Sequence, residues 1–313
     1  MPDAALYLNA ERLLELLTPD AALQAVQAFF GSHSREQVAA PPRIHLPVPG
    51  QNTVGLYMPA ATSGYVGVKI VHLMPERRPA VEAEVFLYDA ETGKLLFWGD
   101  GKPLTGLRTA AVSTAATLRL LPRCERLLVY GAGVQAAAHV SAFAAAYPEL
   151  HRIEAVTRSV DSFRRLQALL PAALRERVTH CTEPAAALAG AQCVITTTPA
   201  TEPLFAWEAL CETCHITAIG SATEDMNEIP PQAYLESRVW VDTTGALREA
   251  GDSLAAIRQG WHQGRLEGDL FDLLGAQRAA VPSGGHTLFK SVGNAAQDLA
   301  IFIHLWELLM REA

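Results

Sequence analysis

A glycine turn between a short apolar run and an alanine-rich segment carries the clearest chemistry in the sequence. Residues 127–130 are typical of a parallel strand buried on both faces, and residues 134–147 have strong helix propensity. Gly131 permits the tight turn, Gly133 lets the backbone approach a pyrophosphate, and Ala136 keeps helix and strand close. Phosphate would bind the free N–H groups of the helix N-terminus. The predicted cofactor residues of this turn are Gly131, Ala132, Gly133, Val134 and Gln135.

The alternative is a close-packed turn that binds nothing. A second strand-like run at residues 153–156 arrives at the spacing of a βαβ unit and favours the cofactor. The end of that run indicates which cofactor, because NAD enzymes usually place a carboxylate there and a 2′-phosphate needs cations and hydroxyl donors. This chain offers Thr157, Arg158 and Ser159, which predicts NADPH over NADH, unless Arg158 merely caps a solvated loop.

Three cations stand out before residue 120. Arg43 follows two prolines, Lys69 lies inside an apolar run, and Arg108 is embedded in a weakly charged helical segment. A buried lysine or arginine needs an anionic partner. That partner is either a ligand or an internal carboxylate such as Glu82, Glu84 or Asp100, and the residue pattern leaves both open.

The order of strand-like and helical segments predicts an α/β protein of two domains. Before residue 100 the strand-like runs are joined by a hairpin turn at residues 91–93, which indicates an antiparallel or mixed sheet. Strand and helix then alternate to residue 242, as in a doubly wound parallel sheet. The predicted Rossmann domain spans residues 119–286, and an α+β domain combines residues 1–118 with residues 287–313, which include a helix at 291–310.

The composition of the chain argues against nucleic acids and membranes as binding partners. The chain has 313 residues, 50% of them hydrophobic, with a net charge of −8 and a pI of about 5.7, which disfavours nucleic acid and anionic membrane. No apolar run approaches the ~20 residues that span a bilayer. The first residues, Met-Pro-Asp-Ala, lack the basic flank and apolar core of a signal peptide. We therefore expect a cytoplasmic protein with no nucleic-acid or membrane partner.

One cysteine spacing matches a known cofactor pattern. Cys211-Glu-Thr-Cys214-His215 has the spacing of c-type haem attachment and could also begin a zinc site. Haem attachment requires export, no second cysteine pair exists, and His215 begins an apolar strand-like run. We interpret the spacing as coincidence and predict no metal site.

Motifs along nearly the whole chain resemble the ornithine cyclodeaminase/mu-crystallin family. They are Pro41-Pro-Arg43, Gly67-Val-Lys69, Asp89-Ala-Glu-Thr-Gly93, Asp100-Gly101, Leu104-Thr-Gly-Leu-Arg108-Thr109-Ala-Ala, Gly131-Ala-Gly-Val-Gln135-Ala136 and Phe289-Lys-Ser291-Val-Gly293. The resemblance implies a homodimer whose first domain, completed by the C-terminal helix, supplies the dimer contact and the substrate pocket. It also implies that Arg43, Lys69 and Arg108 bind the substrate carboxylate, with Lys69 and Arg108 as catalytic residues.

Two departures from the family pattern reduce the number of family activities that this chain could have. Cyclodeaminases and the related alanine dehydrogenases carry an aspartate and then a lysine after the glycine that matches Gly220, whereas this chain has Ala222 and Met226 at those positions. Alanine cannot supply the proton chemistry of the aspartate. The pattern is similar to the NADPH-using ketimine reductase branch. Further cofactor contacts are assigned to Thr109, Thr198, Ser221, Met226 and Ser291, although hydroxyls such as those of Thr109, Thr198 and Ser291 nearly as often cap helices.

The predicted function is NADPH-dependent reduction of a cyclic ketimine carboxylate, Δ1-piperideine-2-carboxylate or Δ1-pyrroline-2-carboxylate, to the cyclic amino acid. A protonated imine is already an electrophile, so the site needs no strong acid; Glu84, Asp225 and Glu228 stay open as proton donors. The alternatives are reduction of an open-chain imine by an alanine-type dehydrogenase, ornithine cyclodeamination, and a non-catalytic protein that binds NADPH and a carboxylate ligand.

Overall fold

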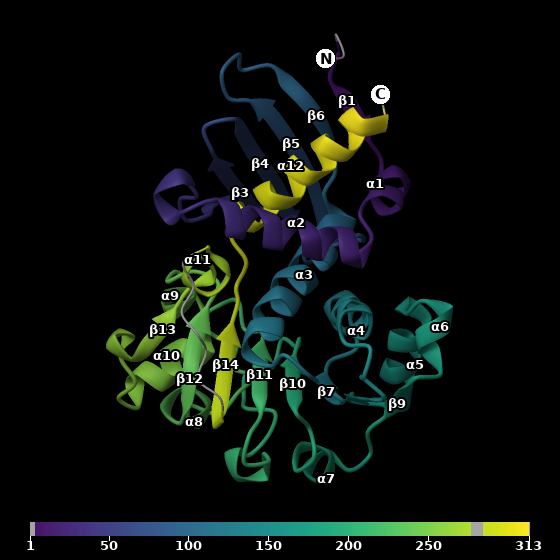
Figure 1. Cartoon of the computed structure of the whole chain (residues 1–313), viewed down its shortest axis with the longest axis vertical. Helices are drawn as coiled ribbons and strands as arrows, with labels where there is room; N and C mark the ends of the chain where they lie inside the picture. Colours follow the sequence, from purple (N-terminus) through teal and green to yellow (C-terminus); the bar gives the residue numbers. More distant parts are fainter. Residues whose placement is uncertain (1–3, 277–283, 313) are drawn as a thin grey trace. The chain divides into compact units, whose positions relative to one another are not determined.

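Alternating apolar residues in the first third of the chain form the strands of one sheet, and continuous apolar runs in the second half form another (Figure 1). The computed structural model describes residues 4–276 and 284–312. The chain divides into unit 1, Met1–Val112 with Gly293–Ala313, and unit 2, Ser113–Val292.

Unit 1 holds a six-stranded sheet, within its described residues, in the order β1-β6-β5-β4-β3-β2, with β1 parallel to β6 and the other pairs antiparallel. The strands are β1 (Leu6–Leu8), β2 (Ile44–Pro47), β3 (Val54–Ala61), β4 (Tyr65–Leu73), β5 (Val81–Asp89) and β6 (Leu95–Asp100). The helical segments are α1 (Ala10–Leu16), α2 (Pro19–Ser32), η1 (Arg35–Gln37), the first part of α3 (Lys102–Leu120) and α12 (Ala295–Glu312).

Helix α12 packs across the sheet against β4, as Figure 1 shows. A Cβ on Gly67 would lie 2.8 Å from Phe302 Cδ2 and 2.9 Å from Leu299 Cδ1, so glycine at this position of β4 allows the close approach of the helix. The helix therefore covers the face of the sheet to which Gly67 and Lys69 point, because side chains two residues apart on a strand share a face.

Unit 2 is a parallel sheet with helices, and its strand order among the described residues is β13-β12-β14-β11-β10-β7-β8-β9. The strands are β7 (Arg126–Tyr130), β8 (Arg152–Val156), β9 (Val178–His180), β10 (Cys193–Thr196), β11 (His215–Ala218), β12 (Ser237–Val241), β13 (Leu266–Gly268) and β14 (His286–Lys290). The helical segments are α4 (Val134–Ala146), α5 (Val160–Leu169), α6 (Ala172–Arg175), α7 (Pro184–Leu188), η2 (Trp207–Ala209), α8 (Gln232–Leu235), α9 (Ala246–Glu249), α10 (Gly251–Arg258), η3 (Gln263–Arg265) and α11 (Leu270–Leu274).

The predicted α/β class with a doubly wound parallel sheet is confirmed. From β7 the chain moves outward through β8 and β9 and then returns to place β10 on the other side of β7, which makes a switch in strand order between β7 and β10. Ligands of such sheets bind at the carboxyl ends of the strands beside this switch.

The unit boundaries differ from those expected from sequence. The predicted boundary between residues 286 and 287 falls inside β14, which pairs with β11 and β12 of unit 2, so the chain returns to unit 1 only at Gly293. The predicted helix at 291–310 begins at Ala295 instead, because Gly293 has a φ of 79° that ends the extended segment. The other boundary lies inside α3, at Val112/Ser113 and not at 118/119.

Two histidines are fully buried in unit 2 among hydroxyl groups. His139 contacts Ser113 Oγ at 3.0 Å, and the His215 ring nitrogens contact Thr287 Oγ1 at 2.8 Å and Thr217 Oγ1 at 2.9 Å. Both ring nitrogens of His215, the histidine of the cysteine-containing pattern, are thus bonded to threonines. Burial lowers the pKa of His139 to about 4 and that of His215 to about 3.

These lowered pKa values predict a loss of stability in acid. Below the ordinary histidine pKa of about 6.5, both histidines bind a proton in the unfolded chain. In the folded chain they stay neutral until the pH reaches their lowered pKa values. We expect the free energy of unfolding to fall by about 1.4 kcal/mol per pH unit for each histidine, from about pH 6.5 down to the folded pKa values. Urea titrations of His139→Gln, compared with His262→Gln at an exposed position, test this. Equal acid sensitivity in both variants would contradict the assignment to His139.

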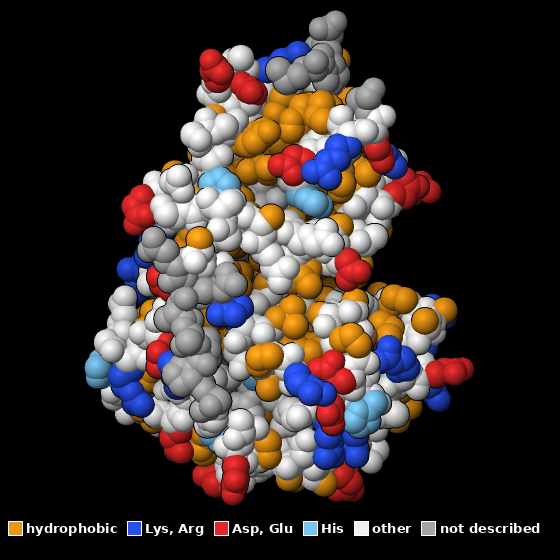
Figure 2. Space-filling view, in the orientation of Figure 1, with side chains coloured by type: hydrophobic (Ala, Val, Ile, Leu, Met, Phe, Trp, Pro, Cys, Tyr) orange, Lys and Arg blue, Asp and Glu red, His pale blue; other side chains and the backbone are white. Residues whose placement is uncertain are grey.

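Acidic and basic side chains are interspersed on the face that Figure 2 shows. Within the described residues, no helix combines the length and the apolar character needed to cross a bilayer.

Candidate active site

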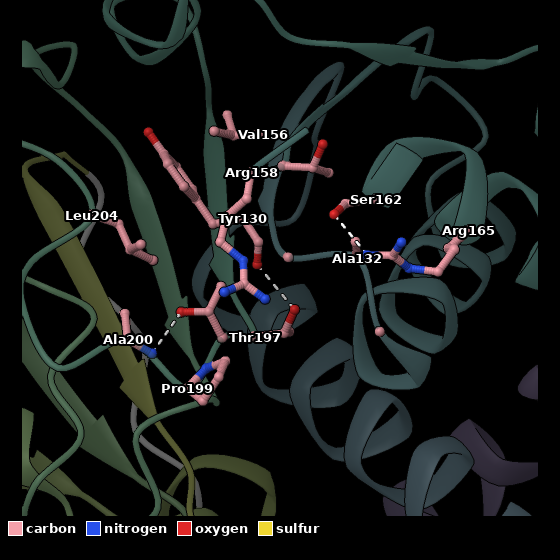
Figure 3. A pocket seen from close by; sticks show the side chains of 14 residues that line it. Tyr130, Ala132, Val156, Arg158, Ser162, Arg165, Thr197, Pro199, Ala200 and Leu204 are labelled. Atoms are coloured by element: carbon pink, nitrogen blue, oxygen red, sulfur yellow. Dashed lines mark hydrogen bonds between the residues drawn. The ribbon is translucent and has the colours of Figure 1, made fainter. Parts of the chain in front are cut away.

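A cavity of about 550 Å³ lies in unit 2 at the carboxyl ends of β7, β8 and β10, beside the switch in strand order (Figure 3). It is lined by Tyr130, Gly131, Ala132, Gly133, Val156, Thr157, Arg158, Ser162, Arg165, Thr197, Thr198, Pro199, Ala200 and Leu204. Five of the residues predicted for the cofactor from the two strand ends, and Thr198 besides, therefore meet at one cavity: Gly131, Ala132, Gly133, Thr157 and Arg158.

The glycine turn has the geometry that a pyrophosphate requires. Gly131 has a φ of 129°, and a Cβ there would lie 2.4 Å from Thr197 Oγ1, so the position demands glycine. Gly133 is the N-cap of α4, and no side chain caps that helix, so its first N–H groups are available to an anion. Val134 and Gln135 begin α4, and the buried Oε1 of Gln135 has no hydrogen-bond partner among the described residues. This arrangement fits a dinucleotide.

The tip of β8 is cationic. The described residues that line the cavity include no carboxylate, whereas Arg158 and Arg165 are both among them. Thr157 donates from Oγ1 to Ser159 O at 2.9 Å, and Ser159 caps α5 by accepting from Ser162 N at 3.1 Å. Ser159, which was predicted as a cofactor residue, is not among the cavity residues. As the N-cap of α5 it orders the turn that follows the strand.

Sequence reasoning missed Ser162 and Arg165. Arg165 donates from Nη2 to Ser162 Oγ at 2.8 Å, and Ser162 Oγ lies 3.1 Å from Ser159 Oγ. Positions 162 and 165 follow the Ser159 cap at helical spacing, so one face of α5 carries a hydroxyl group and a guanidinium toward the cavity. That spacing after a strand end is a signal that the sequence contained.

Seven of the predicted cofactor residues do not line this cavity: Val134, Gln135 and Ser159, described above, and Thr109, Ser221, Met226 and Ser291. Ser221 donates from Oγ to Met226 O at 2.6 Å, and Ser291 donates from Oγ to Asp242 Oδ2 at 2.8 Å, so both buried hydroxyl groups are used inside unit 2. Thr109 belongs to unit 1 and donates to Thr105 O at 2.8 Å within α3. Contact of Thr109, Ser221, Met226 and Ser291 with a cofactor stays a prediction.

Glu228 is a fully buried carboxylate that ties together the segments after β10 and β11. It accepts from Thr196 Oγ1 at 2.9 Å, from Gly220 N at 2.6 Å and from Ser221 N at 3.1 Å, and also from the backbone N–H of Thr198. These donors occupy the carboxylate, so Glu228 is suited to positioning Thr198 in the cavity and not to passing a proton to a substrate. Asp225, another carboxylate considered from sequence, is exposed and bonds to Thr223.

In unit 1, three cations gather around one carboxylate. Lys69 Nζ lies 2.7 Å from Asp298 Oδ1, and Arg108 Nε lies 3.0 Å from the same oxygen. Arg108 also donates from Nη1 to Gln297 Oε1 at 2.6 Å, and Arg43 donates from Nη2 to Gly293 O at 2.7 Å. The residues that the family resemblance assigns to the substrate carboxylate are thus brought together within one unit.

The internal partner of the buried cations is Asp298, which sequence reasoning did not consider. The carboxylates weighed from sequence lie elsewhere: Glu82 pairs with Lys102 at 2.6 Å, Asp100 Oδ2 lies 3.8 Å from the same Nζ, and Glu84 is opposite Asp100 in the β5–β6 register. Asp298 is 229 residues from Lys69 in sequence, so no local pattern joins them.

The cluster around Asp298 carries an excess of positive charge. Burial lowers the pKa of Lys69 to about 8; Arg108 and Arg43 also lower it, and Asp298 raises it. Asp298 Oδ2 has no hydrogen-bond partner among the described residues, and the Arg108 Nε–H is not aligned for a hydrogen bond. Two buried cations, Lys69 and Arg108, face the single carboxylate of Asp298, and the Arg108 Nε–H still lacks an aligned acceptor, which favours binding of a further anion.

Gly293 has a structural reason to be glycine at this cluster. Its φ is 79°, and a Cβ there would lie 2.5 Å from Arg108 Nη1. Any side chain would displace the guanidinium, so the glycine just before α12 lets the arginine reach Gln297 and Asp298.

Known proteins match the chain along nearly its whole length. The model of the ornithine cyclodeaminase/mu-crystallin family matches residues 5–311. A Delta(1)-pyrroline-2-carboxylate/Delta(1)-piperideine-2-carboxylate reductase from Azospirillum brasilense is 32% identical over 293 residues, which cover 91% of this chain and 90% of that protein. The ketimine reductase mu-crystallin of Mus musculus is 31% identical over 317 residues, which cover 96% of each.

A solved structure supports the fold. Thermococcus litoralis Delta(1)-pyrroline-2-carboxylate reductase, in complex with NADH and L-proline, has a TM-score of 0.87 to this chain at 24% identity and covers 98% of both chains. The fold, the motifs around Lys69, Arg108 and Gly131, and the full-length match agree with the resemblance stated from sequence. The chain belongs to the ornithine cyclodeaminase/mu-crystallin family.

Proposed function

We propose that the protein is a nicotinamide-dependent oxidoreductase that reduces the C=N bond of a cyclic imino acid, Δ1-pyrroline-2-carboxylate or Δ1-piperideine-2-carboxylate, with NADPH preferred over NADH. The observation that carries the proposal is the pair of buried cations Lys69 and Arg108 at the one carboxylate of Asp298, with half-buried Arg43 near Lys69, because this positive charge suits a small carboxylate. Relatives that are 31–32% identical are named as reductases of such imines.

The residues of unit 1 would bind and orient the substrate. Arg108 supplies a planar fork for two carboxylate oxygens, and Lys69 supplies a point charge. A carboxylate fixed in this way holds the ring and its C=N carbon in one orientation, which lowers the entropy cost of reaching the transition state. Bound NADPH would supply the hydride, on a cofactor site that the glycine turn and the arginines of the cavity fit.

No strong acid is required of the protein. A cyclic imine that is protonated in solution arrives with its proton on nitrogen, so the enzyme has only to bind the iminium form and exclude water. Ala222 in place of the family's aspartate agrees with this role, because reduction does not need the amine and proton chemistry of cyclodeamination. The same substitution disfavours ornithine cyclodeaminase activity.

The test is turnover by purified protein of Δ1-pyrroline-2-carboxylate and Δ1-piperideine-2-carboxylate, followed by NADPH absorbance and repeated with NADH. Pyruvate with methylamine tests an open-chain imine, and ornithine tests cyclodeamination. We expect fast, NADPH-preferring reduction of a cyclic imine. Tight NADPH binding without turnover of any imine would refute the proposed reductase activity and favour a non-catalytic binding protein.

The pKa of Lys69 predicts a pH dependence of substrate affinity. Lys69 is protonated below about pH 8 and attracts a carboxylate; above that pH it loses its charge. We expect the dissociation constant of pyrrole-2-carboxylate, a planar ring acid that does not titrate in this range, to rise by up to tenfold per pH unit above about pH 8. Isothermal titration measures this, and Lys69→Arg should flatten the profile. A constant affinity across pH 8 in the wild type would contradict the role of Lys69.

We also propose a homodimer formed through the open face of the six-stranded sheet. A row of apolar residues crosses that face in register, on the side away from Gly67 and α12: Tyr7, Trp98, Phe86, Val68 and Pro59. Tyr7 is 57% exposed and Trp98 is 37% exposed, and a second copy could bury such a row against itself. Sedimentation analysis should show a dimer for the wild type and a monomer for Trp98→Glu. A dimeric Trp98→Glu protein would place the contact elsewhere.

A further inference from the structure

The two arginines of the cavity lie at different places in it. Arg158 lies two residues after the end of β8, and Arg165 is on α5. Figure 3 shows the Arg165 guanidinium held against Ser162 on the side of the glycine turn, whereas the Arg158 side chain extends into the cavity on the side of Thr197 and Pro199. The structure therefore adds a second cationic position, Arg165, to the one at Arg158 that was predicted from the sequence.

The Arg165 position suits a phosphate. Its guanidinium is fixed by the 2.8 Å bond to Ser162 Oγ, and Ser162 is 6% exposed and bonded to the Ser159 cap. Neither Arg165 nor Arg158 pairs with a carboxylate among the described residues, whereas the neighbouring Arg164 pairs with Asp161 at 3.1 Å and is 73% exposed. A fixed guanidinium with no internal anion, next to hydroxyl groups and the turn that receives the ribose, matches the needs of a 2′-phosphate.

The Arg158 position suits a base. The walls around it are the apolar residues of the cavity, Val156, Pro199, Ala200 and Leu204, which accommodate a flat aromatic ring. A guanidinium that extends over this apolar part of the cavity can stack on the face of an adenine ring. That contact is the same for a cofactor with or without a 2′-phosphate.

We propose that Arg165, positioned by Ser162, is the residue that binds the 2′-phosphate and sets the preference for NADPH, and that Arg158 covers the adenine of NADPH and NADH alike. This assignment rests on the proposed function, because it concerns the cofactor of that reaction. It predicts that cofactor preference depends on a helix residue and not on the strand tip.

The test compares equilibrium binding of 2′,5′-ADP and 5′-AMP, measured by isothermal titration, in the wild type and in single variants. For Arg165→Met we expect affinity for 2′,5′-ADP to fall by about 10- to 100-fold, with 5′-AMP changed less than about threefold. For Arg158→Met we expect both ligands to weaken by similar factors. Arg164→Met is the matched control and should leave both affinities unchanged, and Ser162→Ala should give a smaller loss that is selective for 2′,5′-ADP.

Three outcomes separate this inference from the proposed function. A wild type that prefers 2′,5′-ADP, with selective loss in Arg165→Met, supports the assignment. The same wild-type preference with selective loss in Arg158→Met, or in neither variant, overturns the assignment and leaves NADPH as the cofactor. A wild type that binds 5′-AMP and 2′,5′-ADP equally well overturns both the NADPH preference and the assignment. Steady-state constants for NADPH and NADH should follow the same pattern.

Discussion

Replacing Arg108 by alanine is expected to lower kcat/KM for the imino acid by about 100- to 1,000-fold and to leave the dissociation constant of NADPH within about threefold. Arg108 is 5% exposed; its Nη1 donates to Gln297 and its Nε faces Asp298, which fixes the guanidinium for the carboxylate that we propose it binds. Alanine removes this guanidinium and leaves Arg43 and Lys69 to bind the carboxylate, while the predicted cofactor cavity of unit 2 keeps every one of its residues. Initial rates against imine concentration and a fluorescence titration with NADPH measure the two effects.

Two further variants show which property of Arg108 matters. Arg108→Lys keeps a charge and loses the planar fork, so its loss should lie between those of wild type and Arg108→Ala. Arg12→Ala removes an exposed arginine of unit 1 that pairs with Glu15 and should leave kcat/KM unchanged. If kcat/KM of Arg108→Ala stays within about threefold of wild type, Arg108 does not bind the substrate.

The second large effect is expected at Asp298. Asp298→Asn keeps the shape of the side chain and removes the carboxylate that faces Lys69 and Arg108, both nearly fully buried. Breaking a buried ion pair from one side costs about 3–5 kcal/mol, because it leaves uncompensated charge in a medium of low dielectric. We expect the free energy of unfolding to fall by that amount at neutral pH, as measured by urea titration followed by circular dichroism.

A matched control and a compensating variant distinguish charge from packing. Glu82→Gln breaks an ion pair with Lys102 in which both side chains are more than 40% exposed, and it should cost less than about 1 kcal/mol. Adding Lys69→Met to Asp298→Asn removes one of the buried positive charges that the first substitution leaves uncompensated, and it should restore part of the lost stability. A double variant less stable than Asp298→Asn would show that the loss comes from packing around the site.

The glycine turn and the strand ends of unit 2 could be predicted from sequence because their signals are local. Gly131 and Gly133 follow a buried strand directly, and Arg158 follows the next strand, so neighbours in sequence are also neighbours in the cavity. The parallel sheet followed from the alternation of strand and helix for the same reason. Arg165 was within reach of the same reasoning, but its place depends on the helical turn of α5 after Ser159.

Asp298 and β14 could not be predicted because their partners are distant. The contact between Lys69 and Asp298 spans 229 residues, and a helix that carries an apolar stripe gives no sign of which of its polar residues faces a buried cation. Strand β14 is five residues long and inserts between β11 and β12, although it follows β13 in sequence. Its position is therefore decided by pairing in the sheet and not by its neighbours in the chain.

The position of α12 in the chain has a consequence for folding during synthesis. Every described strand of unit 2 lies before Ser291. Unit 1 cannot complete its core before α12 is made, because Lys69 and Arg108 are synthesised long before the helix that carries Asp298. Until then the two cations must stay hydrated, which keeps the first sheet from burying its α12 face early. We therefore expect unit 1, although most of it is made first, to complete its folding only after α12 has emerged, which differs from the usual N-terminal order.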